Sequence, residues 1–140
     1  MKIRCLGNRG SQLPEAVLSF PGVTTDARYD IEVGAEYVVY ATCCWTDCSW
    51  HYLIVDDAGH DRPSWYPADL FEIVDGRFPP HWMMSYFGWG DWPRSVSLKA
   101  VIGYAEMMDP AHHDALQDRR EEALRLFAVR RRETEAWHSE

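Results

Sequence analysis

Hydrophobic and polar positions alternate in short runs through the first half of the chain, with turn residues between the runs. Runs rich in Val, Ile, Tyr and Trp and bounded by Gly, Pro or Asp are typical of β-strands. One helical turn is expected at residues 14–18, within the loop-like region that follows the first run. The predicted strands cover residues 2–6, 36–44, 50–55, 64–66 and 71–74.

The pattern changes after Pro79 and Pro80. Residues 95–102 predict one more strand, and Asp109 followed by Pro110 predicts a helix start. The Asp side chain can accept hydrogen bonds from the free N–H groups of the first turn, and Pro suits the first helical position. Apolar residues at helical spacing then predict one helix to about residue 135. Its expected apolar stripe consists of Leu116, Ala123, Leu124, Phe127 and Ala128.

Five short strands in the first half predict a small β-barrel, closed or half-closed. In the segment WYPADLFEIV at 65–74 a strand, a proline, a 3₁₀ turn and a last strand follow one another, which resembles the end of SH3-like barrels. The segment VGAEYVV at 33–39 resembles their earlier strand entry. This resemblance implies one α+β domain over 1–140, with an SH3-like β-barrel at 1–78 and an aromatic-rich strand segment and C-terminal helix at 79–140. The loop at 8–35 differs from that of peptide-binding SH3 domains.

Acidic residues concentrate in the middle of the chain. Residues 26–75 contain eleven acidic and two basic side chains, a net charge of −9, whereas residues 118–135 sum to +1. This charge repels phosphate backbones and therefore argues against nucleic acid as a partner. It suits a basic protein partner, whose approach electrostatic attraction would accelerate. The alternative is a solvated acidic surface that only keeps the protein in solution.

The chain shows no sign of membrane insertion or export. No apolar run reaches the roughly 18 residues that a membrane span needs. The N-terminal MKIRCLGNRG lacks the apolar region of a secretory signal. We therefore expect a cytoplasmic protein without a membrane partner.

Three of the four cysteines lie in the segment ATCCWTDCSWHY at 41–52. Zinc sites usually use Cys-x₂-Cys pairs, and the chain has none. On an extended strand Cys48 and His51 would point to opposite faces, which argues against both a shared metal ion and a thiol activated by this histidine. The EF-hand, G-x-S-x-G and H-E-x-x-H patterns are also absent. We therefore expect packed thiols, no metal, no cofactor and no catalytic residues.

The aromatic segment PPHWMMSYFGWGDW at 79–92 has two interpretations. Large aromatic side chains could cover the open face of the barrel as core. Tryptophan, tyrosine and methionine are also enriched in protein interfaces. A mixed outcome would bury Trp82 and Phe87 and leave Trp89 and Trp92 beside an exposed loop.

The segments WYPADLFEIVD and FGWG, together with the acidic single-domain build, resemble small bacterial proteins, some of which are immunity proteins of polymorphic toxin systems. This resemblance implies a non-enzymatic protein that neutralises a basic toxin by direct binding. The alternative is a small-ligand binder or an enzyme that uses an aromatic pocket between barrel and helix. The expected partner-binding residues are Asp56, Asp57, Asp61, Trp89, Asp91 and Trp92.

Overall fold

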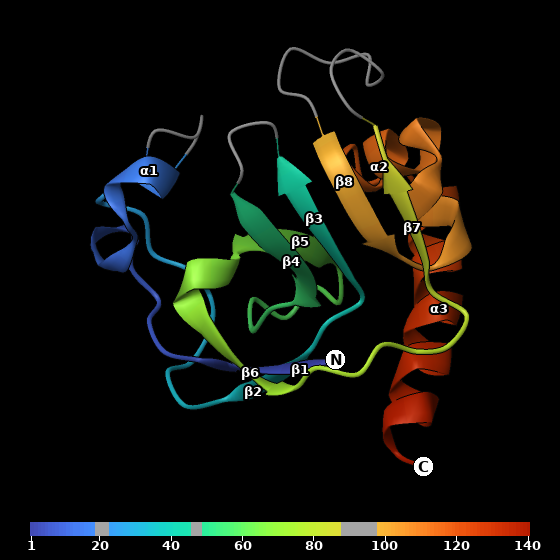
Figure 1. The fold of residues 1–140 in the computed structure, drawn as a ribbon, viewed down its shortest axis with the longest axis horizontal. Coiled ribbons are helices and arrows are strands. Elements are labelled where there is room, and N and C mark those ends of the chain that lie inside the picture. Colours follow the sequence, from blue (N-terminus) through green and yellow to red (C-terminus); the bar gives the residue numbers. More distant parts are fainter. Residues whose placement is uncertain (19–22, 46–48, 88–97) are drawn as a thin grey trace.

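The computed structural model describes residues 1–18, 23–45, 49–87 and 98–140. In this part of the chain two antiparallel sheets are followed by helices at the C-terminal end (Figure 1). The predicted α+β class is therefore confirmed.

The smaller sheet has the strand order β2-β1-β6. Its central strand β1 (Lys2–Cys5) pairs antiparallel with β2 (Glu36–Val38) and with β6 (Phe71–Asp75). Residues of β1 alternate between the interior and the surface, so that Ile3 is fully buried while Arg4 points outward. The Arg4 guanidinium contacts acidic side chains on both neighbouring strands, at 2.8 Å and 3.4 Å.

The larger sheet has the order β5-β4-β3-β8-β7. Strand β8 of the second half pairs with β3 of the first half, so the two halves of the sequence share this sheet. The bounds are β3 Ala41–Trp45, β4 Trp50–Val55, β5 Pro63–Pro67, β7 Met83–Tyr86 and β8 Leu98–Gly103.

The prediction of a single strand at 36–44 is wrong, because this segment divides into β2 and β3, which belong to different sheets. At the division the Val39 N–H donates to the Met1 carbonyl, and the next N–H, from Tyr40, donates to Leu53. The two sheets do not join into one closed barrel in the described part of the chain. The order of strand, proline, 3₁₀ turn and strand is confirmed, since a turn at Ala68–Leu70 connects β5 to β6.

The C-terminal region forms two helices, α2 (Pro110–Gln117) and α3 (Glu121–His138), and the single predicted helix is therefore wrong. The chain breaks at Arg119, whose φ of +56° is incompatible with a continuing right-handed helix. The predicted cap is confirmed, since the Asp109 carboxylate accepts from the Ala111 N–H at 2.9 Å. The earlier helical turn is α1, Glu15–Leu18.

Neither α2 nor α3, nor the short α1, has the length and apolar character that crossing a membrane requires.

Two hydrophobic clusters fill the interior. The first contains side chains of both sheets, such as Ile3 and Tyr52, together with Leu70 of the 3₁₀ turn. The second lies where the larger sheet meets the helices, and it includes Phe127 and Leu116 of the predicted stripe. The helices therefore cover one face of the larger sheet, while the smaller sheet packs against residues of the other face.

Candidate functional site

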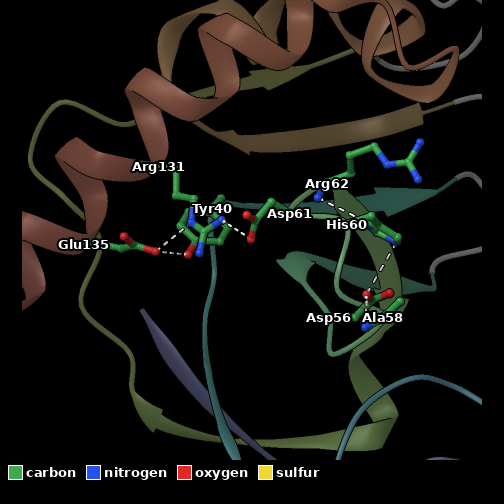
Figure 2. A network of polar contacts seen from close by, with 8 residues as sticks. All are labelled: Tyr40, Asp56, Ala58, His60, Asp61, Arg62, Arg131 and Glu135. Atoms are coloured by element: carbon green, nitrogen blue, oxygen red, sulfur yellow. Dashed lines mark hydrogen bonds and ion pairs between the residues drawn. The ribbon is translucent and has the colours of Figure 1, made fainter.

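The β4–β5 turn at residues 56–62 carries three of the residues expected to bind a partner, Asp56, Asp57 and Asp61. Figure 2 shows Asp56 and Asp61. Asp56 begins this turn, but its side chain is only 6% exposed. It accepts hydrogen bonds from the Tyr66 hydroxyl and from the Ala58 N–H at 3.0 Å, and His60 Nε2 lies 3.7 Å away. Asp56, expected as a partner contact, thus has a buried side chain, and its carboxylate holds the turn against β5. Burial, and then the bond to Asp56, raise the pKa of Tyr66 well above its usual range.

Asp61 lies at the other end of the turn and is 88% exposed, as expected. Arg131 of α3 is 3.3 Å away through Nη1, and its Nε donates to Glu135 at 2.8 Å. Tyr40 donates to the same Glu135 at 2.6 Å, so a chain of polar contacts connects the turn to α3 (Figure 2). Burial opposes ionisation of Glu135, but the bonds from Arg131 and Tyr40 lower its pKa overall. Arg131 thus offsets part of the charge that Asp61 could offer to a partner.

Asp57 is exposed and connects the turn to the segment before β2. Its N–H donates to the Asp30 carbonyl at 2.8 Å, and its carboxylate accepts from the Tyr37 hydroxyl at 2.5 Å. The same hydroxyl accepts from the Glu32 N–H at 2.8 Å. These bonds bring three acidic residues to one place, although Asp57 lies 25 or more positions away in sequence from the other two.

A hollow of about 580 Å³ opens at this place, and we call it the acidic hollow. Ile31 is buried at 5% exposure, which turns the flanking Asp30 and Glu32 outward. Within the described chain, no Lys, Arg or His nitrogen lies within 4 Å of the carboxylates of Asp30, Glu32 or Asp57. The hollow is lined by Asn8, Tyr29, Asp30, Ile31, Glu32, Val33 and Asp57.

The sequence prediction did not include Asp30 and Glu32 among the contact residues. A usable signal was the alternation Asp-Ile-Glu at 30–32, in which the apolar residue goes inward and both acids go outward. The three remaining expected contacts, Trp89, Asp91 and Trp92, lie outside the described residues.

The aromatic side chains in the described part of the aromatic segment are partly in the core and partly on the surface. Trp82 and Phe87 are partly buried and pack against the first and the second hydrophobic cluster, respectively. Phe78 stacks on Trp82 with ring centroids 5.4 Å apart. Tyr86 is 63% exposed, so this segment contributes both to the core and to the surface.

The cysteines do not form a reactive site where the structure describes them. Cys5, Cys43 and Cys44 are buried free thiols, and Cys48 lies outside the described residues. Burial raises the pKa of the Cys43 thiol well above its usual value, which suppresses the nucleophilic thiolate. Residues 1–18, 23–45, 49–87 and 98–140 contain no group of three or more His, Cys, Asp or Glu side chains that could hold a metal ion.

We predict that the purified protein carries four free thiols and no stoichiometric zinc. The spacing of the cysteines suits neither a disulfide nor a four-ligand site. Thiol titration under non-reducing denaturation should give four thiols for the wild type and three for Cys48→Ser, and elemental analysis should find no zinc. One zinc per chain, or a wild-type count well below four, would refute the prediction.

Two further hollows bear on the alternative of a ligand pocket. The hollow between the larger sheet and α2 contains Trp65 and Leu116 and measures about 290 Å³, at or below the roughly 300–1,000 Å³ of typical ligand sites. A larger hollow of about 640 Å³ lies beside α1. We call it the aromatic hollow, and its lining includes Trp50, Tyr52 and Phe71.

We predict that Asp56 acts on stability. Asp56→Ala would leave the buried Tyr66 hydroxyl and the Ala58 N–H without their acceptor, which should cost about 1–3 kcal/mol of unfolding free energy. The matched control Glu32→Ala removes an exposed acid for which the structure shows no side-chain bond, and should change stability by under about 0.5 kcal/mol. Urea unfolding measures both, and equal effects would contradict the structural role of Asp56.

Comparison with known proteins identifies no relative of the chain. No protein-family model, curated protein or solved structure matches it. The resemblances to SH3-like barrels and to immunity proteins therefore rest on the sequence segments that suggested them.

Proposed function

We propose that this chain is a non-enzymatic, cytoplasmic binding protein that captures a basic protein partner at the acidic hollow. The most specific form of the proposal is an immunity protein that blocks a basic toxin by covering its active site. The observation that carries it is the group of uncompensated carboxylates, Asp30, Glu32 and Asp57, around one concave surface. A lysine or arginine of the partner would find three acceptors there and no competing cation among the described residues.

The contact residues differ in part from those that the sequence suggested. Asp56 has internal partners and Asp61 has Arg131, so they contribute to the field rather than to direct contact. Asp57 stays in the proposed contact, joined by Asp30 and Glu32. Because exposed charge pairs are individually weak, the collective field should act mainly on the association rate.

Trp89, Asp91 and Trp92, which lie outside the described residues, remain proposed contacts. If Trp89 or Trp92 anchors the partner, its replacement by Ala should change dissociation rather than association, since buried aromatic anchors set the lifetime of complexes.

Affinity purification with matched baits tests the proposal. The wild-type bait should capture a basic protein, identified by mass spectrometry, that the bait Asp30→Lys/Glu32→Lys does not retain. Both substitutions replace exposed side chains for which the structure shows no bond, so the second bait should stay folded. Capture of the same protein in the same amount by both baits would contradict binding at the acidic hollow.

The aromatic hollow supports a second candidate, the binding of a small apolar or aromatic ligand. Trp50 is 43% exposed at its rim, and aromatic walls are common in ligand sites. A ligand that quenches tryptophan fluorescence in the wild type and not in Trp50→Phe would favour this function over capture of a basic protein.

A further inference from the structure

The outer edges of the two sheets differ in how they are protected. Exposed edge strands carry unpaired N–H and C=O groups, and proteins usually block them with proline, charge or a covering element. In the described part of the chain β5 and β7 are the edges of the larger sheet, and β2 and β6 are those of the smaller one. Strand β5 has a proline at each end and shares a hollow with residues of α2. Strand β2 has three residues and begins with Glu36.

Strands β6 and β7 both expose large apolar side chains, but only β6 also carries charge. On β6, Ile73 is 58% exposed between Glu72 and Asp75, which must remain hydrated. Strand β7 reads Met-Met-Ser-Tyr and has no charged residue. Its Met84 is 60% exposed and its Tyr86 is 63% exposed. Figure 1 shows β7 at the outer side of the sheet, next to β8. Among the described edges, β7 is thus the one without a blocking residue.

The hydrogen bonds to β8 show which backbone groups of β7 are directed outward. The Phe87 N–H donates to the Lys99 carbonyl at 2.8 Å, one position beyond the Tyr86–Ala100 pair. Hydrogen-bonded and non-hydrogen-bonded pairs alternate along an antiparallel ladder. Since Phe87 is in a hydrogen-bonded pair, Ser85, two positions away, is in one as well and bonds to β8. Met84 and Tyr86 are in the non-hydrogen-bonded pairs, so their N–H and C=O groups point away from β8. The side chains of Met84 and Tyr86 share one face of the sheet.

We propose that β7 pairs antiparallel with β7 of a second copy of this chain, about a two-fold axis at Ser85. In this arrangement Met84 of each copy lies opposite Tyr86 of the other, and each such pair exchanges two backbone hydrogen bonds. The thioether meets the tyrosine ring, a favourable sulfur–aromatic contact. The two five-stranded sheets become one continuous sheet, joined by an isologous interface.

A second copy is the occupant that fits this edge, because its own β7 offers the same outward backbone groups and sets Met84 against Tyr86 without adding a charge. The chain has a net charge of −8, so two copies repel one another wherever acidic surfaces meet. The β7 strand brings no carboxylate to the interface. Because the edge is four residues long, the contact is smaller than that of a stable dimer. We therefore expect a reversible dimer whose population rises with protein concentration. This inference does not depend on the proposed capture of a basic partner.

Sedimentation velocity over a range of concentrations tests the dimer. The mean mass of the wild type should rise toward twice the chain mass, and Met84→Lys should weaken association by about tenfold or more, because it places a charge on the edge. The matched control Ile73→Lys changes an equally exposed apolar residue on β6 and should associate like the wild type. A wild type that stays monomeric up to about 1 mM would overturn the proposal. So would equal weakening by both substitutions.

A cysteine at the two-fold axis tests the register. Ser85 of one copy would face Ser85 of the other as a non-hydrogen-bonded pair, with Cα atoms about 4.5 Å apart, within the range of a disulfide. Mild oxidation should link Ser85→Cys into a dimer on non-reducing gels, whereas the wild type and Met84→Lys/Ser85→Cys should stay monomeric. A concentration-dependent dimer that Ser85→Cys does not link would overturn the β7 pairing.

Discussion

Phe127→Ala should lower the free energy of unfolding by about 3–5 kcal/mol, the usual cost of truncating a buried aromatic side chain. Phe127 is 1% exposed and packs edge-on against Tyr40, with ring centroids 5.3 Å apart. It belongs to the cluster that attaches α3 to the larger sheet. Its removal leaves a cavity at this junction, which chemical denaturation monitored by circular dichroism would measure.

Val129→Ala is the matched control on the same helix. Val129 is 41% exposed, so its truncation should change stability by under about 1 kcal/mol. A loss under 1 kcal/mol for Phe127→Ala would mean that α3 does not depend on this contact and would contradict the packing described above.

Asp30→Lys/Glu32→Lys should slow association with the basic partner by about tenfold or more, since clustered charges raise the association rate by roughly 10- to 1,000-fold. Both carboxylates flank the buried Ile31 at the acidic hollow. Dissociation should change less, because rim charges act mainly before the complex forms. Stopped-flow mixing of the purified chain with the protein captured by the wild-type bait measures both rates.

The control for this experiment changes the charge by the same amount elsewhere. Asp118→Lys/Glu122→Lys reverses two exposed acids where α2 passes into α3. It should slow association clearly less than the change at the acidic hollow. Equal slowing by the two variants would mean that net charge alone governs the rate and that the acidic hollow has no special role.

The parts of the fold that the sequence predicted well are those that local chemistry determines. Strand β4 occupies the predicted residues 50–55, and Asp109 caps α2 as its sequence context suggests. The division between β2 and β3 could not be predicted, because both halves have the same β-type composition and the change of sheet arises from pairing with distant residues. The break before α3 could not be predicted either, since Arg119 adopts a positive φ at a position that glycine usually occupies.

The candidate site was predictable as a region and not residue by residue. Asp56 and Asp57 are adjacent and chemically alike, and the sequence does not say which of them the Tyr66 hydroxyl will draw inward. The pairing of Asp61 with Arg131 spans 70 positions and depends on where α3 packs. Asp30 and Glu32 reach the turn through tertiary contacts, namely the bond from the Asp57 N–H to the Asp30 carbonyl and the Tyr37 hydroxyl that bonds to both Asp57 and Glu32.

The most direct test of electrostatic capture is the association rate of the wild-type chain with its captured partner at two salt concentrations. Exposed charges are screened over about 10 Å at 0.1 M salt and about 3 Å at 1 M. We expect the association rate to fall about tenfold or more across this range, and to fall much less for Asp30→Lys/Glu32→Lys. A wild-type rate that does not change with salt, together with an unchanged rate for the reversed variant, would contradict capture by the acidic hollow.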